Sequence, residues 1–302
     1  MNKQDISDGV CAYLQGGLGN QLFIYAAAFS EAKRLDCELY VDISKYTKRD
    51  PLDRHKETPR KPELISLGLP GIVIDENSPW SGNSPRRPPL LRVPGSGSRK
   101  LNVFAERQAS YNAAVESIQI GTTLYGYFQS YKYFQTVGDE LHNLLLGSNL
   151  TNPDQAAIDA LEGKQNIHAH VRRGDYVDPV VAAHHGIASA DYFARSQKLL
   201  KELQGQTALS VFTDSPSLVQ QEFGRMHDYS IFDDSELTTF GAIRALSQGS
   251  ALIMSNSSFS WWAAWLMTRN SSKPIIAPRP WQNNGSAAAD LLLPDWLTLD
   301  SR

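Results

Sequence analysis

The sequence predicts an α/β fold built on parallel β-sheets, and its second half shows the pattern most clearly. From residue 166 onward, short apolar segments alternate with longer amphipathic segments. Strands and helices that alternate in this way form right-handed βαβ units around a parallel sheet. The chain begins similarly, with an apolar segment, a glycine-rich turn, a helical segment and another apolar segment. We therefore expect two α/β domains, residues 1–150 and 151–302.

The first half has a regular beginning and end around an irregular middle. From composition and spacing we expect strand 9–15, turn 16–20, helix 21–35, strand 37–43, strand 122–128 and helix 131–146. Residues 44–119 show no regular period, and residues 84–100 are dominated by Pro, Gly, Ser and basic residues. The segment 84–100 is expected to be a loop or an insert.

The second half follows a polar linker at residues 147–155. Its expected strands are 166–171, 207–213, 229–232, 251–255 and 273–278, and its expected helices are 190–204, one starting at 216, 236–248 and 258–268. No internal repeat relates the two halves.

Composition indicates a globular protein without a global preference for anionic partners. The chain has 302 residues, 41% of them hydrophobic, and a formal net charge of −3. Any anion must therefore be recognised locally. Cys11 and Cys37 are expected to pack in the core rather than to form a disulfide. The first residues contain no apolar run, so we expect neither a signal peptide nor a membrane anchor, and a cytoplasmic location.

Polar residues collect where three expected strands of the second half end. These are Arg172, Arg173 and Asp175 after the first strand, Thr213 and Asp214 after the second, and Ser255, Asn256, Ser257 and Ser258 after the fourth. In an open parallel sheet, ligands bind beyond the carboxyl ends of the strands. One crevice is expected to hold all of these residues.

The residue types at these strand ends favour a diphosphate. The N–H groups and dipole of a helix start attract anions, and planar guanidinium groups match phosphate oxygens. Asn256 or Ser257 alone would more simply cap its own helix. Asp214 suits a purine or ribose, but a helix cap is an equally good interpretation.

Several other sites are excluded by missing residues. Leu22 occupies the third glycine position of a dinucleotide fingerprint, and no P-loop sequence occurs. The chain contains no Asp-x-Asp pair, no His/Cys cluster with metal-ligand spacing and no G-x-S-x-G elbow. His184 and His185 are expected in a loop. We therefore expect no bound metal, and a serine hydrolase is disfavoured.

Five motifs, in order, resemble the α-1,2-fucosyltransferases of glycosyltransferase family 11. They are GGLGNQLFIYAAA (16–28), HVRRGDYV (170–177), FTDSPS (212–217), ALIMSNSSFSWWAAWL (251–266) and KPIIAPRPW (273–281). The resemblance implies two Rossmann-like domains facing a cleft, the GT-B arrangement. It also implies GDP-β-L-fucose as donor, no essential metal, and inverting transfer to the 2-hydroxyl of a galactose. Animal members carry an N-terminal anchor, so the chain is similar to bacterial members.

The resemblance also implies roles for individual residues. Domain 151–302 would bind GDP-fucose through His170, Arg172, Arg173, Asp214, Ser257, Ser258 and Phe259. Domain 1–150 would lie on the acceptor side, where Asn20 is expected near the reaction. Gly16, Gly17 and Gly19 would let the backbone approach the ligands, although an ordinary turn is the alternative.

Catalysis is expected to depend on Arg172, which would stabilise the charge of the departing phosphate. Asp175 is the best-placed carboxylate for a base, with Asp178 behind it, but a salt bridge between Asp175 and Arg173 is slightly favoured. Trp265 is expected in a core or interdomain contact, and Trp262 is left open.

The expected acceptor is a galactose-terminated glycan or a lipid-linked oligosaccharide. The basic segment 84–100 is expected to be solvated, with contact to an anionic lipid-linked acceptor at the inner membrane face as the alternative. Two other functions stay open: a fucosyltransferase of different linkage or acceptor, and a nucleotide-sugar binding protein without turnover.

Overall fold

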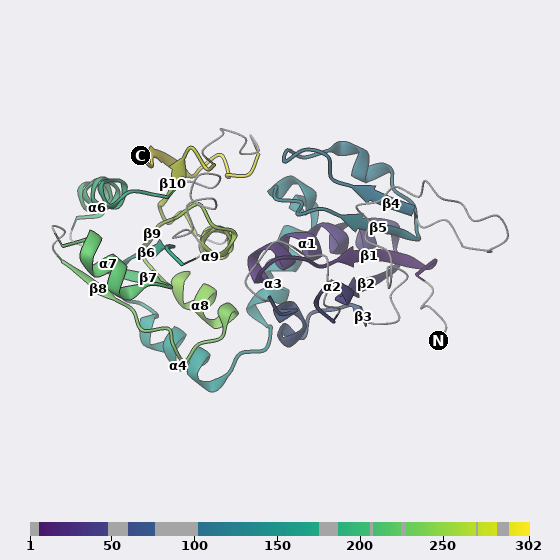
Figure 1. Cartoon of the computed structure of the whole chain (residues 1–302), viewed down its shortest axis with the longest axis horizontal. Helices are drawn as coiled ribbons and strands as arrows, with labels where there is room; N and C mark the ends of the chain where they lie inside the picture. The colour runs from purple at the N-terminus through teal and green to yellow at the C-terminus, as the bar shows by residue number, and fades with distance from the viewer. Residues whose placement is uncertain are drawn as a thin grey trace. The chain divides into compact units, whose positions relative to one another are not determined.

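The computed structural model describes residues 6–47, 60–75, 102–174, 187–205, 208–224, 228–269, 271–282 and 290–302. The chain divides into two compact units, unit 1 (Met1–Ser148) and unit 2 (Asn149–Arg302). Each contains a parallel sheet flanked by helices (Figure 1). The predicted α/β class with two parallel sheets is confirmed.

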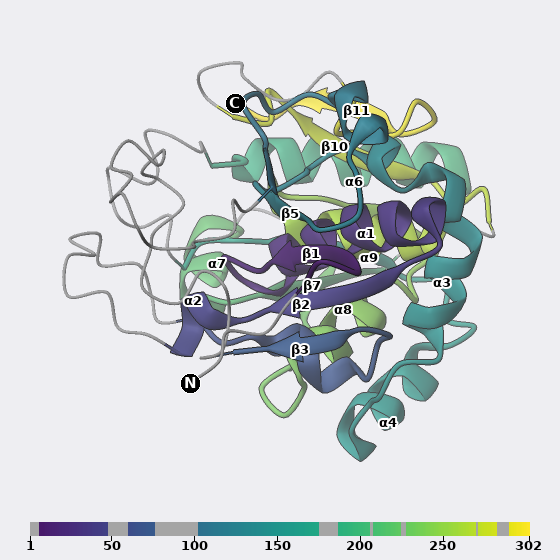
Figure 2. The same cartoon turned by 90° about the vertical axis from the view of Figure 1, so that its right-hand side faces the viewer.

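Unit 1 has a five-stranded parallel sheet in the order β3-β2-β1-β5-β4. Its elements are β1 (Gly9–Tyr13), α1 (Leu18–Leu35), β2 (Glu38–Asp42), α2 (Ser44–Thr47), β3 (Ile72–Ile74), β4 (Asn102–Ala105), β5 (Thr122–Tyr125) and α3 (Gly138–Leu146), with short 3₁₀ turns η1 (Glu63–Leu67), η2 (Ala113–Ser117), η3 (Tyr131–Tyr133) and η4 (Gln135–Val137). Figure 2 shows β1, β2 and β3 side by side. The edge strands β3 and β4 lie in the part of the sequence that showed no regular pattern.

The end of unit 1 differs from the expected strand and helix. The strand stops at Tyr125 because Gly126 has φ 159° and Phe128 has φ 51°, which turn the chain out of the sheet. The predicted helix at 131–146 begins only at Gly138, after η3 and η4. Buried Phe134, at φ −137° and ψ 16°, interrupts it. Packing of an aromatic side chain therefore overrides a helical composition.

Unit 2 has a six-stranded parallel sheet in the order β11-β10-β9-β6-β7-β8. Its elements are α4 (Asn152–Leu161), β6 (Ile167–Val171), α6 (Ala190–Gln204), β7 (Leu209–Thr213), α7 (Pro216–Glu222), β8 (Tyr229–Ile231), α8 (Thr239–Leu246), β9 (Ala251–Ile253), α9 (Ser258–Thr268), β10 (Ile275–Arg279) and β11 (Leu297–Asp300). The chain runs from β6 outward to β8 and then resumes at β9 on the other side of β6. Strand order therefore reverses between β6 and β9.

The core of unit 2 lies on both faces of its sheet. On one face, strand side chains such as Ile167 and Val211 pack with Phe193 of α6 and Val219 of α7. The tryptophans of α9 are also buried: Trp261 and Trp262 are 0% exposed and Trp265 is 3% exposed. Their rings pack edge-to-face on one another. The expected burial of Trp265 is confirmed, and the open question about Trp262 resolves to packing.

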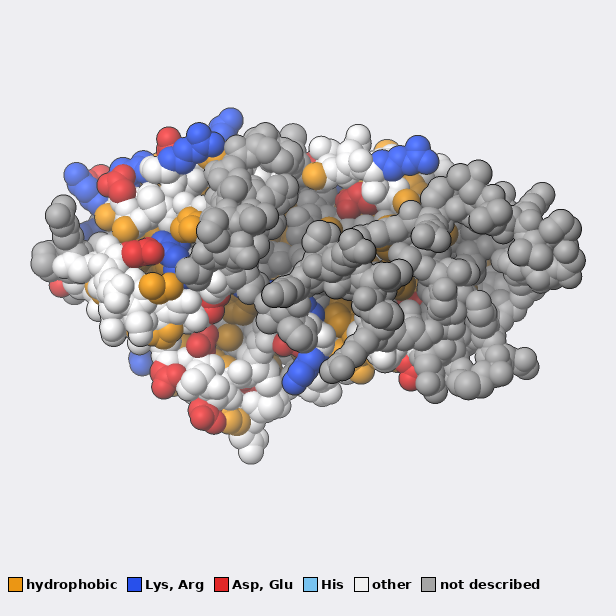
Figure 3. Space-filling view, in the orientation of Figure 1, with side chains coloured by type: hydrophobic (Ala, Val, Ile, Leu, Met, Phe, Trp, Pro, Cys, Tyr) orange, Lys and Arg blue, Asp and Glu red, His pale blue; other side chains and the backbone are white. Residues whose placement is uncertain are grey.

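The surface carries charges of both signs. Where described side chains are visible in Figure 3, Lys and Arg are interspersed with Asp and Glu. A mixed surface agrees with the net charge of −3.

Asp154 ties two helices of unit 2 together. Its carboxylate accepts the backbone N–H of Thr151 (2.9 Å) and completes the capping box at the start of α4. It also accepts the N–H (2.9 Å) and the hydroxyl (2.9 Å) of Thr238, the residue that caps α8. Burial alone would raise the pKa of Asp154, but these hydrogen bonds lower it below the ordinary value of 3.8. The two helix starts share one carboxylate.

Replacing Asp154 by Ala is therefore expected to destabilise the protein by about 3 kcal/mol, because the caps are lost and buried donors are left unpaired. Urea unfolding at pH 7 measures the loss. Asp159→Ala, on the same helix and exposed, should change stability by less than about 0.5 kcal/mol. Since the pKa of Asp154 is lowered, its contribution should fade as the pH falls below 3.8. Equal effects of the two substitutions would contradict the shared-cap role.

Candidate functional site

The candidate site of unit 2 lies where its strand order reverses, between the carboxyl ends of β6 and β9. These strands are hydrogen-bonded neighbours, and the chain after β9 leads directly into α9 (Figure 1). Tyr192 of α6 secures this edge, because its hydroxyl lies 2.9 Å from the carbonyl of Met254 and 3.1 Å from that of Ile276. An order reversal of this kind is the usual ligand position in open parallel sheets.

His170, on β6, contacts residues that follow β9, and so connects the two strands between which the order reverses. Its Nδ1 lies 2.8 Å from the hydroxyl of Ser255, which follows β9. Its ring stacks on Phe259 of α9, with centroids 4.6 Å apart. Burial, followed by the charge of Arg172, lowers the pKa of His170 to about 3. The imidazole is therefore neutral at physiological pH and can hydrogen-bond a ligand but not supply positive charge.

Arg172 and Arg173 face different surroundings although they are adjacent. The Arg172 side chain is 22% exposed and its Nη1 lies 3.9 Å from Oδ2 of Asp214. Arg173 is 3% exposed. Its Nε and Nη2 bind Glu222 at 2.8 and 2.7 Å, while Nη1 donates to the carbonyl of Arg172 and Nη2 to that of Ala188, both at 3.0 Å. Arg172 is the arginine that can reach a ligand.

These contacts bear on the expected role of Arg173. The resemblance implied that it is a second ligand of the diphosphate, and its guanidinium is held by Glu222 and two carbonyls. These contacts fix the segment that follows β6, and contact of Arg173 with the diphosphate stays a prediction. The sequence pattern did not point to Glu222, which lies 49 residues away.

Asp214 shapes the segment that carries both arginines. Its Oδ1 accepts the backbone N–H groups of Arg173 (2.9 Å) and Gly174 (3.0 Å). A Cβ atom on Gly174 would lie 2.6 Å from Oδ2, so only glycine fits there without a shift. Ser215, not Asp214, is the residue at the N-cap of α7. Asp214 therefore holds the segment that carries Arg172 and is not the cap of α7, and its contact with a purine or ribose stays a prediction.

The start of α9 combines a cap with an anion-attracting helix end. Ser257 is the N-cap, and its hydroxyl accepts the N–H of Phe259 at 3.3 Å. The cap interpretation thus holds for Ser257, while Asn256 instead donates to the carbonyl of Trp281 at 3.1 Å. Ser258 begins the helix and is half-buried. The positive end of the helix dipole still lies at this terminus.

In unit 1, the predicted turn after β1 lies beside the chain that follows the neighbouring strand β5. Oδ1 of Asn20 accepts a hydrogen bond from Nε2 of Gln129, beyond β5, at 2.8 Å. Gln15 similarly donates to the carbonyl of Gly126 at 3.2 Å. Gln129 was not among the expected residues, and its position just after a strand neighbouring β1 is the signal that would have indicated it. Asn20 is thus joined to the end of the neighbouring strand.

The glycines of this turn are not equivalent. Gly16 has φ 75°, and a Cβ there would lie 2.7 Å from the Asn20 amide. A Cβ on Gly17 would meet only Arg60, at 3.9 Å. The conformation therefore requires Gly16, whereas Gly17 has open space beside it. Gly19 is buried in the first turn of α1.

Fully buried Gln21 anchors this turn to the chain before η1. Its amide donates to the carbonyls of Gly16 (3.0 Å) and Lys61 (2.7 Å) and accepts the N–H of Leu64 at 3.0 Å. The hydroxyl of Tyr46 also donates to the carbonyl of Gly16 (2.8 Å). The turn that carries Asn20 is rigidly held.

Other expectations lie outside the described residues or away from the site. Asp175, Asp178, His184, His185 and the segment 84–100 are outside the described ranges. Within the described parts of the chain, no group of three His, Cys, Asp or Glu side chains could hold a metal ion. None of the described helices is long and apolar enough to cross a membrane.

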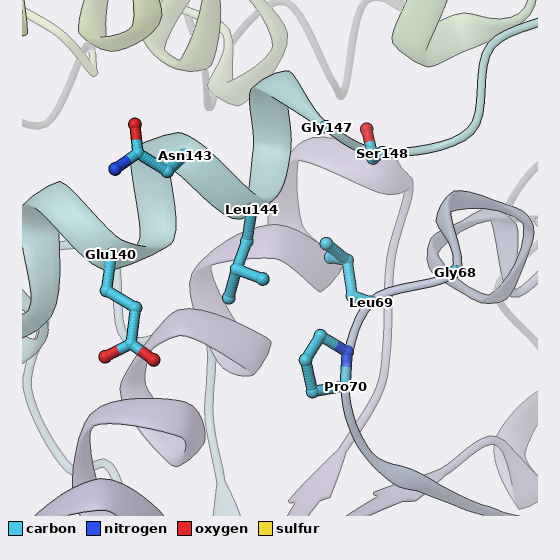
Figure 4. A pocket seen from close by; sticks show the side chains of 8 residues that line it. All are labelled: Gly68, Leu69, Pro70, Glu140, Asn143, Leu144, Gly147 and Ser148. Carbon is cyan, nitrogen blue, oxygen red and sulfur yellow. The ribbon is translucent and has the colours of Figure 1, made fainter.

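A separate hollow of about 570 Å³ lies beside α3 in unit 1. Figure 4 shows Leu144 of α3 facing Leu69 and Pro70. The carboxylate at its rim, Glu140, is bound to Lys33 at 2.9 Å. The hollow contains none of the expected site residues.

Two bacterial proteins and a solved structure are similar to this chain. The protein O-antigen biosynthesis glycosyltransferase WbnK of Escherichia coli is 24% identical over 95% of this chain and 99% of its own length. An alpha-1,2-colitosyltransferase of Escherichia coli is 28% identical over 90% of this chain and 92% of its own. The crystal structure of the fucosyltransferase NodZ from Bradyrhizobium aligns over 85% of this chain and 92% of its own, at 19% identity and a TM-score of 0.46.

The family described as glycosyl transferase family 11 matches residues 111–300 of this chain. The match includes the segments that carry Arg172, Asp214 and the start of α9, and it begins after the Asn20 turn. Because it covers more than half of the sequence, the chain belongs to glycosyltransferase family 11.

Proposed function

We propose that this glycosyltransferase moves L-fucose from GDP-β-L-fucose to the 2-hydroxyl of a galactose, with inversion at the anomeric carbon. The observation that carries the proposal is the placement of Arg172: a partly exposed guanidinium beside the strand-order reversal, on a segment that Asp214 holds in place. The acceptor that we propose is a galactose-terminated glycan or a lipid-linked oligosaccharide.

Arg172 and the start of α9 would stabilise the leaving GDP. As the bond to fucose breaks, negative charge builds on the β-phosphate oxygen, and fixed positive groups stabilise this charge more in the transition state than in the ground state. Neutral His170 would hydrogen-bond the nucleotide without adding charge. Ser257, Ser258 and Phe259 would supply the helix start on which the phosphates bind.

On the acceptor side, Asn20 would orient the attacking hydroxyl opposite the leaving group. A single in-line displacement from that direction gives inversion. Asp175 is our candidate for the base.

A second candidate donor differs in its sugar. One relative of this chain is an alpha-1,2-colitosyltransferase, and colitose lacks the 3-hydroxyl of L-fucose. A site that hydrogen-bonds this hydroxyl rejects the deoxy sugar by about 10⁴-fold or more, because a buried polar group would be left unpaired. The choice between L-fucose and colitose as donor sugar therefore depends on whether the site hydrogen-bonds the 3-hydroxyl.

Incubation with GDP-fucose and a panel of galactosides is expected to release GDP and to give a product fucosylated at the galactose 2-hydroxyl. Release is followed by a coupled GDP assay and the linkage by NMR. GDP-colitose in the same assay compares the two donors through kcat/KM. Faster colitosyl transfer would replace fucose in the proposal. Thermal stabilisation by GDP without transfer to any acceptor would identify a non-catalytic binding protein.

Replacing Arg172 by Ala is expected to lower kcat/KM for transfer by about 10²–10³ while the melting temperature stays close to that of the wild type. Arg172→Lys should be similarly impaired, because an ammonium cannot reproduce the planar guanidinium fork. Steady-state kinetics and thermal unfolding measure both effects.

Substitutions of two other arginines serve as comparisons for Arg172→Ala. Arg195→Ala removes an exposed side chain that binds Asp191 and should leave transfer unchanged. Arg173→Ala should mainly lower the melting temperature, since its buried contacts are structural. Near-normal turnover of Arg172→Ala would contradict the proposed role.

Treatment with a chelator should leave transfer within about twofold of the untreated rate, because Arg172 and the α9 terminus supply the positive charge that a metal would otherwise provide. The test compares initial rates after EDTA dialysis with rates after added Mg²⁺ or Mn²⁺. Activity that disappears on chelation and returns only with a divalent ion would contradict this arrangement.

A further inference from the structure

Glu106, directly after β4, is half-buried and holds a turn of unit 1 with its carboxylate. Its Oε2 accepts the backbone N–H groups of Tyr127 (2.8 Å) and Phe128 (3.0 Å). Its Oε1 is buried and has no hydrogen-bond partner among the described residues. Burial raises the pKa of Glu106, although the two N–H groups oppose the shift. A buried carboxylate oxygen without a hydrogen-bond partner lowers the stability of the fold. We therefore expect the turn that Glu106 holds to serve a purpose other than stability.

The turn at residues 126–129 adopts a conformation that its own sequence does not favour. Phe128 has φ 51°, in the left-handed region that non-glycine residues rarely enter. Its ring is fully buried and packs against Phe104 and Tyr133. A Cβ on Gly126 would lie 2.4 Å from Cβ of Glu106. Strained turns of this kind persist only where the surroundings fix them, and they concentrate at functional sites.

The same arrangement holds Arg172 in unit 2. There, the last paired residues of β6 and β7 are Val171 and Thr213, and the next residue of β7, Asp214, accepts the N–H groups of Arg173 and Gly174. In unit 1, Ala105 pairs with Tyr125. The next residue, Glu106, accepts two consecutive N–H groups in the same register. In both units a carboxylate after one strand holds the segment that follows its neighbour.

The segment held by Glu106 ends at the amide pair of Gln129 and Asn20. Their hydrogen bond uses the nitrogen of Gln129 and the oxygen of Asn20, at 2.8 Å. The other amide groups of the pair are an N–H₂ donor on Asn20 and a carbonyl acceptor on Gln129. A sugar hydroxyl donates one hydrogen bond and accepts others, so adjacent donor and acceptor groups match it.

We propose that Glu106 is a positioning residue for the acceptor sugar: by fixing the turn at 126–129 it holds Gln129 against Asn20, and this amide pair binds acceptor hydroxyls. The proposal rests on the proposed function for the identity of the acceptor as a sugar. Glu106 itself does not touch the substrate. It acts through Gln129.

The test is a double-mutant cycle with Glu106→Ala and Gln129→Ala. Each single variant is expected to raise the acceptor KM about tenfold or more, since small misplacement of positioning groups is costly. The GDP affinity should not change, because the proposed donor residues are in unit 2. The double variant should be no worse than the more impaired single variant, since both remove the same interaction. Glu106→Gln keeps an oxygen for both N–H groups but loses the charge, so its acceptor KM should rise only about threefold.

Hydrogen exchange supplies a readout that does not depend on turnover. In Glu106→Ala, protection of the peptide covering residues 126–129 should fall, while that of β6 and α9 stays at the wild-type level. Glu140→Ala, which removes an exposed carboxylate bound to Lys33, is the matched control and should change neither exchange nor KM. A wild-type protein that transfers no fucose contradicts the proposed function, and the exchange result still decides whether Glu106 holds the turn.

Three results would overturn the inference. The first is an acceptor KM in the double variant that rises by the product of the two single-variant factors. The second is a GDP affinity that falls in the single variants. The third is unchanged exchange at 126–129 in Glu106→Ala. If Glu106→Ala does not fold, Glu106→Gln replaces it in the cycle, and a wild-type acceptor KM in that variant is equally decisive against the proposal.

Discussion

The hydrogen bonds that the backbone after β6 donates to Asp214 are the contacts on which the proposed donor site depends. Two consecutive N–H groups, those of Arg173 and Gly174, bind the same carboxylate oxygen. This fixes the direction in which the chain leaves the strand. Arg173 then turns inward to Glu222, and Arg172 keeps its partial exposure beside Oδ2 of Asp214. Two adjacent arginines, which would otherwise repel, thus acquire separate acceptors and separate roles.

The position of this carboxylate follows from the parallel sheet. Neighbouring parallel strands end at the same edge, so the residue after β7 lies next to the segment after β6. Glu106 and the segment after β5 repeat the arrangement in unit 1. In each unit a glycine is required where the backbone passes the carboxylate: Gly174 beside Asp214 and Gly126 beside Glu106. In each sheet, neighbouring strands therefore end side by side, and one acidic residue fixes the conformation of the segment that follows the neighbouring strand.

The sequence was sufficient for the parts of the fold that depend on local pattern. The regular β/α alternation after residue 166 predicted the sheet of unit 2, and Arg172, Arg173 and Ser255 lie just beyond the strands at which its order reverses. Strands β3 and β4 were missed because they are short edge strands with largely exposed side chains, which leave little periodic signal. Arg173 is buried and Arg172 is not because Arg173 binds Glu222, which lies 49 residues away. Asn20 binds Gln129, which lies 109 residues away. Contacts at such separations have no local pattern.

The neutrality of His170 limits how the site can stabilise a leaving diphosphate. Its ring is enclosed by Ser255 and Phe259, and burial together with the Arg172 charge keeps the imidazole unprotonated. A second cation at this position would bind the ground-state diphosphate more tightly, but it would improve the rate only if it favoured the transition state further. With a neutral imidazole, the positive potential among the described donor-side residues comes chiefly from Arg172 and the start of α9. In the proposed reaction both would be in place beforehand, so they would stabilise charge that develops as the sugar departs without reorganising during the step.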